Sequence, residues 1–288
     1  MKKVIALVLA LVMLLSVALT ACAEDIKIGI SIWSSTDTLG SECKRIIDAA
    51  AEALGDVEVQ YVDQAHISEQ VTASAETLAI ADCQGMIICN SASAEMASVI
   101  KTCDENEMYV AQFFRVIDPE ANPDEYAQAC ASPYYVGAVH ESEFDNGKTL
   151  VTILGEKGCR KIGLEGWEPG DATFLGRWAG YQAGVEAWNE AHPDDTMEML
   201  EPQYGRTTTD TGRQAAEAII DANPDIDALI VAGGGGDTLL GALAGIDFKG
   251  LTGKIAVVST DFLPDLDAKL ESGAMAAESG GHYADHIL

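Results

Sequence analysis

Polar and aromatic side chains follow several predicted strands of this chain, and their types suit the binding of a small polar molecule. Trp33 ends the first predicted strand, Asn90 and Asp261 end two later ones, and Arg115 directly follows another. Guanidinium and carboxylate groups make strong charge-assisted hydrogen bonds, and an aromatic ring packs against the apolar face of a sugar. Further residues of this kind at strand ends are Ser34, Ser35, Ser91, Phe114, His140, Glu141, Glu165, Trp167, Asp237 and Phe262. The set predicts recognition of a hydroxyl-rich ligand.

The same positions give little support for catalysis. His140 and Glu141 are adjacent and could act as acid and base, but no nucleophile–base pair or metal set is evident at the strand ends. The glycines at 233–236 resemble a phosphate cradle, yet no Lys with a following Ser or Thr completes a P-loop. The chain has no C-x-x-C and no Cys/His cluster. We therefore expect no catalytic residue, no metal and no cofactor.

Strand and helix patterns alternate and would position these residues. Strands are predicted at 26–33, 57–63, 85–90 and 108–114, with helices at 42–54, 68–82 and 93–106 between them. Such repeats imply right-handed crossovers and a parallel sheet. The segment 115–133 has two Pro-containing turns and no clear period, which predicts a linker. The alternation then restarts, with strands at 134–140, 161–167, 227–233 and 254–261 and helices at 143–157, up to about 191, 211–222 and 237–245.

The predicted fold class is α/β, with two doubly wound parallel-sheet (Rossmann-like) lobes joined by a hinge. We place the N-terminal lobe at 24–132, the C-terminal lobe at 133–280, and the start of a return segment at 281–288. Ligands of open parallel sheets bind beyond the carboxyl ends of the strands. Two such lobes facing each other would bring both sets of strand-end loops into one cleft.

The first 22 residues have the layout of an export signal. Lys2 and Lys3 precede an apolar run from Val4 to Leu19, and small residues lead to Cys22. A retained membrane anchor and ordinary secretion are the alternatives. The tail "LTAC" resembles the bacterial lipobox, so we predict a signal peptide at 1–21 and a lipid on Cys22. This places the protein outside the cytoplasmic membrane, anchored through that lipid.

The formal net charge of the 288 residues is −29. Nucleic-acid binding needs a basic footprint, so this charge argues against a nucleic-acid partner and against docking on anionic lipid. It favours a soluble, self-repelling surface, and an acidic pocket for a cationic ligand is the alternative. Six cysteines remain after Cys22, an even number that permits disulfides without fixing their pairing.

The chain resembles a known family in four segments. They are "DIDALIVAGGGGDTLLGAL" (225–243), "KIAVVSTDFLPD" (254–265), "GRWAGYQAG" (176–184) and, more weakly, "YVGAVHESEFDNGKTL" (135–150). These resemble the type I periplasmic binding proteins, specifically the sugar-binding subunits of ABC importers related to the ribose-binding protein. The resemblance covers nearly all of residues 24–288. It implies lobes that close around a ligand, a closed form that docks on an ABC permease, a monomer, and no chemistry of its own.

The resemblance also implies ligand contacts. It places Asp37, Leu39, Asn90 and Arg115 at the ligand from the first lobe, and Arg177 and Asp261 from the second. Several of these have simpler interpretations, because Asp37, Asp237 and Asp261 could be helix caps and the arginines could be structural ion pairs. The full candidate set is Trp33, Asp37, Leu39, Asn90, Arg115, Trp167, Arg177, Asp237 and Asp261.

Four features depart from the family pattern. Leu39-Gly40 stands where the ribose-type proteins have aromatics, Gly236 where they have Asn, and Gly281 where they have Gln. The ligand is then larger than ribose, or Trp33 and Trp167 supply the stacking. The family also continues past the second crossover with a helix and a strand, which predicts a chain truncated at the C-terminus.

Two other functions compete with an importer subunit. A sensory receptor of the same fold would pass ligand occupancy to a chemoreceptor or kinase. An extracytoplasmic α/β enzyme would need the catalytic groups that the strand ends lack. A cytoplasmic repressor of related fold is excluded by the leader and by the missing DNA-binding headpiece.

Overall fold

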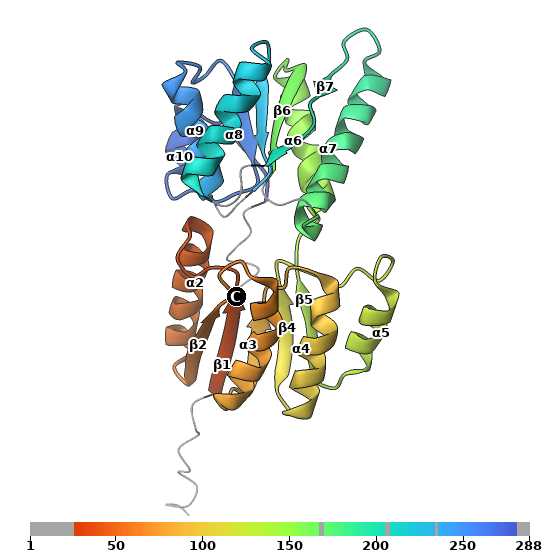
Figure 1. Cartoon of the computed structure of the whole chain (residues 1–288), viewed down its shortest axis with the longest axis vertical. Coiled ribbons are helices and arrows are strands. Elements are labelled where there is room, and N and C mark those ends of the chain that lie inside the picture. Colours follow the sequence, from red (N-terminus) through yellow and green to blue (C-terminus); the bar gives the residue numbers. More distant parts are fainter. Residues whose placement is uncertain (1–25, 167–169, 205–207, 234–235, 281–288) are drawn as a thin grey trace, which may run out of the picture.

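The computed structural model describes residues 26–166, 170–204, 208–233 and 236–280. Figure 1 shows two α/β lobes stacked along the long axis of the molecule. Each lobe consists of a parallel sheet with helices against its faces. The predicted fold class is therefore confirmed.

The first lobe contains a five-stranded parallel sheet in the order β2-β1-β3-β4-β5. Helices α3 and α4 cover one face through a core that includes Val71, Leu78, Met96 and Ile100. Helix α2 covers part of the other face. The strands are β1 (Ile26–Ile32), β2 (Val57–Asp63), β3 (Gly85–Ile88), β4 (Tyr109–Phe113) and β5 (Tyr135–Val139), and the helices are α2 (Thr38–Leu54), α3 (Ser68–Ile80), α4 (Ser93–Glu105) and α5 (Pro123–Ala131).

The second lobe contains a six-stranded parallel sheet built around β6, β9 and β10. Helices α6 and α7 cover one face, and α8 and α9 cover the other, each over its own apolar core. The strands are β6 (Lys161–Gly166), β7 (Glu198–Met199), β8 (Gln203–Tyr204), β9 (Ala228–Val231), β10 (Ala256–Ser259) and β11 (Ala277–Glu278), and the helices are α6 (Glu143–Glu156), α7 (Ala172–Ala191), α8 (Thr209–Ala222), α9 (Asp237–Phe248) and α10 (Leu266–Glu271).

The structure corrects the predicted lobe boundary at residue 133. Strand β5 pairs with β4 in the first sheet, with a register shift between Val110 and Ala111. The chain therefore passes to the second lobe between Val139 and Glu143, after β5 rather than before it. The segment 281–288, expected to begin the return to the first lobe, lies outside the described residues.

The segment 115–133 is not purely a linker, because it contains helix α5. Pro123 stands in the first turn of this helix, where the missing N–H group does not break a hydrogen bond. Ala129 is the buried residue of α5, so the helix lacks the apolar stripe that would have revealed its period.

The six cysteines after Cys22 carry free thiols, and all except Cys130 are buried. In the part of the chain described by the structure, no helix combines the length and the apolar character needed to cross a bilayer.

Candidate functional site

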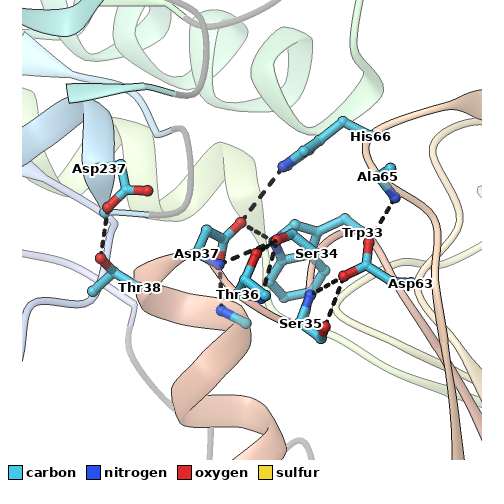
Figure 2. Close-up of polar contacts among 12 residues, drawn as sticks. Trp33, Ser34, Ser35, Thr36, Asp37, Thr38, Asp63, Ala65, His66 and Asp237 are labelled. Atoms are coloured by element: carbon cyan, nitrogen blue, oxygen red, sulfur yellow. Dashed lines mark hydrogen bonds and ion pairs between the residues drawn. The ribbon is translucent and has the colours of Figure 1, made fainter. Parts of the chain in front are cut away.

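The carboxyl ends of the two sheets face each other. Thr38 lies shortly after β1, and Asp237 begins the helix after β9, 199 residues further along the chain. The Thr38 hydroxyl donates a hydrogen bond of 2.7 Å to Asp237 Oδ1 (Figure 2). Residues at the strand ends of both lobes therefore lie close together, as the topology of facing parallel sheets requires.

Asp37 is bound to its own lobe through both carboxylate oxygens. Oδ1 accepts a 2.6 Å hydrogen bond from the Gly40 N–H and so caps α2, and Oδ2 accepts one of 2.9 Å from Trp33 Nε1. His66 Nε2 lies 3.6 Å from Oδ2 (Figure 2). The side chain is only 8% exposed. Asp37 thus fixes the start of α2 and the orientation of the Trp33 indole.

Trp33 belongs to an aromatic cluster at the same end of the first sheet. Its ring centroid lies 6.2 Å from that of Phe113 and 5.8 Å from that of Phe114, and Leu39 packs in the same core. Phe114 has a φ of 60°, which is rare for a bulky side chain. Such strained residues concentrate at functional sites. Phe114 was not among the predicted contacts.

Asn90 is buried in a small hydrogen-bond chain. Its Oδ1 accepts from Gln112 Nε2 at 2.6 Å, and its Nδ2 donates to the Ala92 carbonyl at 3.0 Å. Tyr135 OH donates in turn to Gln112 Oε1 at 2.7 Å. The chain holds the amide of Asn90 at the end of β3 in a defined orientation.

Arg177 forms the strongest ion pair of the site. Its Nε and Nη2 donate to the two carboxylate oxygens of Glu143 at 2.5 and 3.2 Å, and Nη1 donates to the Ala232 carbonyl at 2.6 Å. Burial lowers the pKa of Arg177, but the adjacent Glu143 carboxylate outweighs this and the net pKa is raised. The guanidinium therefore stays charged and joins α6, α7 and the end of β9.

Arg115 connects the two lobes electrostatically. Its Nη1 donates to the Phe114 carbonyl at 3.2 Å, and its buried Nε has no hydrogen-bond partner among the described residues. Burial lowers the pKa of Arg115, but Cys89 and two second-lobe carboxylates, Asp171 and Glu143, raise it by more, so the net pKa is raised. Arg115 thus combines a charge at the lobe junction with a donor that the described part of the chain leaves unused.

Asp261 is a buried carboxyl group at the end of β10, with 4% of its surface exposed. Its Oδ2 accepts a 3.0 Å hydrogen bond from the Gly236 N–H. Burial raises its pKa to about 6, Arg177 opposes this shift, and Asp37 and Glu143 add to it. The first-lobe carboxylate of Asp37 therefore contributes to the raised pKa of Asp261 in the second lobe.

A second buried carboxyl group, Glu165, was noted at a strand end but not predicted as a site residue. It lies in β6, is 0% exposed, and neither of its oxygens has a hydrogen-bond partner among the described residues. Burial raises its pKa to about 9, so the group is protonated at neutral pH.

The structure gathers the predicted residues into two groups. Trp33, Asp37 and Leu39 lie together in the first lobe, and Arg115, Arg177 and Asp261 lie within one electrostatic network. Asp237 contacts Thr38. Trp167 and the lipidation residue Cys22 lie outside the described residues.

Sequence reasoning missed Glu143 and Asp171, which supply the acidic charge opposite the arginines. Asp171 caps α7, accepting from the N–H groups of Thr173 and Phe174, and Glu143 is in the first turn of α6. The sequence signal that could have identified Glu143 and Asp171 is their position at the start of helices that come soon after a strand. Among the residues that the structure describes, no cluster of three His, Cys, Asp or Glu side chains has a metal-binding arrangement.

No family model and no curated protein matches this sequence. Solved structures do match it. One is an ABC transporter periplasmic solute-binding protein from Actinobacillus succinogenes 130z with bound D-allose, with a TM-score of 0.76, 16% identity, and coverage of 91% of this chain and 87% of that one. The chain has the fold of a periplasmic solute-binding protein.

Two more structures of this fold support the likeness. The Caulobacter myo-inositol binding protein with myo-inositol has a TM-score of 0.75 and 18% identity over 92% of this chain and 84% of that one. The periplasmic component of the arabinose ABC transporter from Shewanella sp. ANA-3, bound to L-arabinofuranose, has a TM-score of 0.72 and 18% identity over 91% and 84%.

Proposed function

We propose that this chain is an extracytoplasmic solute-binding lipoprotein of an ABC importer. It binds a sugar or a similar small polar molecule between its lobes, and binding stabilises the closed arrangement of the hinge. The chain carries out no chemistry on the ligand. The proposed contacts are the predicted set, Trp33, Asp37, Leu39, Asn90, Arg115, Trp167, Arg177, Asp237 and Asp261.

The observation that carries this proposal is the meeting of two sets of strand ends at the lobe junction. One set supplies an aromatic cluster around Trp33, and both supply charged groups, with the Asp171 and Glu143 carboxylates raising the pKa of Arg115. A ring with an apolar face and several hydroxyls would match both kinds of surface. The solved structures of this fold contain allose, myo-inositol and arabinofuranose, which supports a polyhydroxylated ligand.

Ligand-dependent thermal stabilisation tests the proposal. We expect at least one sugar, polyol or nucleoside to raise the melting temperature, because a ligand that binds only the folded state stabilises it. Arg115→Ala should abolish the shift. The matched control is Arg45→Ala on the outside of α2, where an exposed Arg pairs with Glu42, and it should leave the shift unchanged. No shift with any compound of these classes would contradict the proposal.

A separate experiment tests whether the protein converts its ligand. A ligand recovered after long incubation with the protein should have its original mass and stereochemistry. A converted product would instead favour an extracytoplasmic enzyme of the same fold.

The anchoring and transport parts of the proposal rest on the leader and on the resemblance. Cys22→Ala should release the protein from the cell membrane and abolish incorporation of labelled fatty acid. Deletion of the adjacent permease gene, where one is present, should stop ligand uptake without changing ligand affinity. We propose a monomer, which sedimentation of the ligand-free and bound forms would test.

A further inference from the structure

Thr38 and Asp237 join the two lobes directly, and we propose that they form a latch that favours the closed arrangement. This inference rests on the proposed function and concerns how that site is regulated. It also assigns Asp237 a different role from the predicted ligand contact. The hydrogen bond from Thr38 Oγ1 to Asp237 Oδ1 is 2.7 Å long and is made by two half-buried side chains (Figure 2).

Each end of the latch is held rigidly by its own lobe. Thr38 is the first residue of α2, directly after the cap Asp37, whose two oxygens are bound by Gly40 and Trp33. Asp237 is the first residue of α9, directly after Gly236. A bond between two side chains at the starts of helices loses little additional conformational freedom when it forms.

The backbones also approach closely at this point. Gly236 has a φ of 90°, and a Cβ atom built on it would lie 3.2 Å from Thr38 Cβ and 2.5 Å from the Phe262 carbonyl oxygen. Glycine therefore permits both the backbone conformation and the close contact. The backbone at Gly236 therefore permits the close approach of the two lobes that the Thr38–Asp237 hydrogen bond requires.

Both atoms of the latch belong to the chain, so the contact contributes to the closed arrangement whether or not a ligand is bound. A hydrogen bond to a carboxylate at a half-buried position changes an equilibrium by about tenfold. The closed-to-open ratio of the ligand-free protein is then about ten times higher than it would be without the bond. A ligand that needs closure would bind more tightly as a result.

The test measures the radius of gyration of the ligand-free protein by small-angle X-ray scattering. Thr38→Val removes the hydroxyl and keeps the side-chain shape, and we expect the closed-to-open ratio to fall about tenfold and the radius to increase. Thr38→Ser keeps the donor and should leave the radius unchanged. Asp237→Ala should reproduce the change seen in Thr38→Val, and the double variant should show no further increase.

An unchanged radius in both Thr38→Val and Asp237→Ala, with both variants folded, would overturn the latch. If Thr38→Val fails to fold, Asp237→Ala alone decides. Loss of ligand binding in Asp237→Ala with an unchanged radius would instead make Asp237 a ligand contact. Because scattering needs no ligand, the latch can fail while the binding function stands. A protein that binds no sugar, polyol or nucleoside can still show the latch.

Discussion

Replacement of Glu165 by Gln is predicted to stabilise the protein, with an effect that grows as pH rises. Glu165 is fully buried in β6, and its carboxyl oxygens have no hydrogen-bond partner in the described part of the chain. Burial raises its pKa from the ordinary value of 4.5 to about 9. The folded protein therefore holds a proton on Glu165 over a pH range in which the unfolded chain releases it.

The sign and size of the effect follow from proton linkage. Below pH 4.5 the carboxyl group is protonated in both the folded and the unfolded chain, so its titration does not change the free energy of unfolding. Because the folded pKa is raised, the free energy of unfolding falls between pH 4.5 and 9 by about 1.4 kcal/mol per pH unit. A pH of 7 lies 2.5 units above the unfolded pKa of 4.5, so the free energy of unfolding is lower there by about 3 kcal/mol. A glutamine of similar shape has no titratable group at these pH values and escapes this loss.

Urea unfolding at pH 5, 6, 7 and 8 would measure the difference between Glu165→Gln and wild type. The control is Glu198→Gln on β7, which is exposed and should track wild type at every pH. A stability difference that stays constant with pH would refute the reasoning, since it would show that Glu165 is ionised in the folded protein. Reduced stability of Glu165→Gln at pH 8 would refute it equally.

Three further changes should have measurable effects. Glu143→Gln removes the carboxylate charge that pairs with the buried Arg177 guanidinium and should cost about 3–5 kcal/mol of unfolding free energy, part of which Arg177→Met on the same background restores. Gly40→Ala places a Cβ 1.9 Å from the Ser34 carbonyl oxygen, so the melting temperature should fall, and an unchanged value would contradict the close approach. Asp261→Asn should flatten the stability profile between pH 3.8 and 6, where the raised pKa makes wild-type stability fall by about 3 kcal/mol as pH rises.

Much of the fold was predictable because several of its strands, though not β1 or β2, are short continuous apolar runs. Such runs, as in β3 and β9, are buried on both faces and indicate a parallel sheet with helices on each side. The sequence of β5 predicts a strand as clearly as the sequences of β3 and β9 do. It contains no signal for which sheet it joins, since that depends on pairing with β4 in three dimensions. The boundary at 133 was wrong for this reason.

The sequence predicts that the strand ends of both lobes meet, but it does not predict which side chains pair there. Strand ends pointed to Arg115 and Asp261, because the topology places them at one edge, whereas only the family resemblance pointed to Arg177, which lies in α7. The partner of Arg177 could not be predicted, since Glu143 comes from a different helix and is one of 46 acidic residues. Glu165 alternates with apolar residues in β6, and this pattern is also typical of a half-buried strand. The sequence therefore did not reveal that Glu165 is fully buried.

The hydrogen bonds within the site determine which substitutions can test ligand binding. Asp37 already caps α2, and Arg177 already joins α6 to β9, so their loss would alter the fold together with any ligand contact. Arg115 differs from both, because its hydrogen bond within the described residues is a single one of 3.2 Å to the neighbouring Phe114 carbonyl. Second-lobe carboxylates raise its pKa, and its Nε has no hydrogen-bond partner among the described residues. A binding defect in Arg115→Ala without a loss of stability would therefore report on the ligand alone.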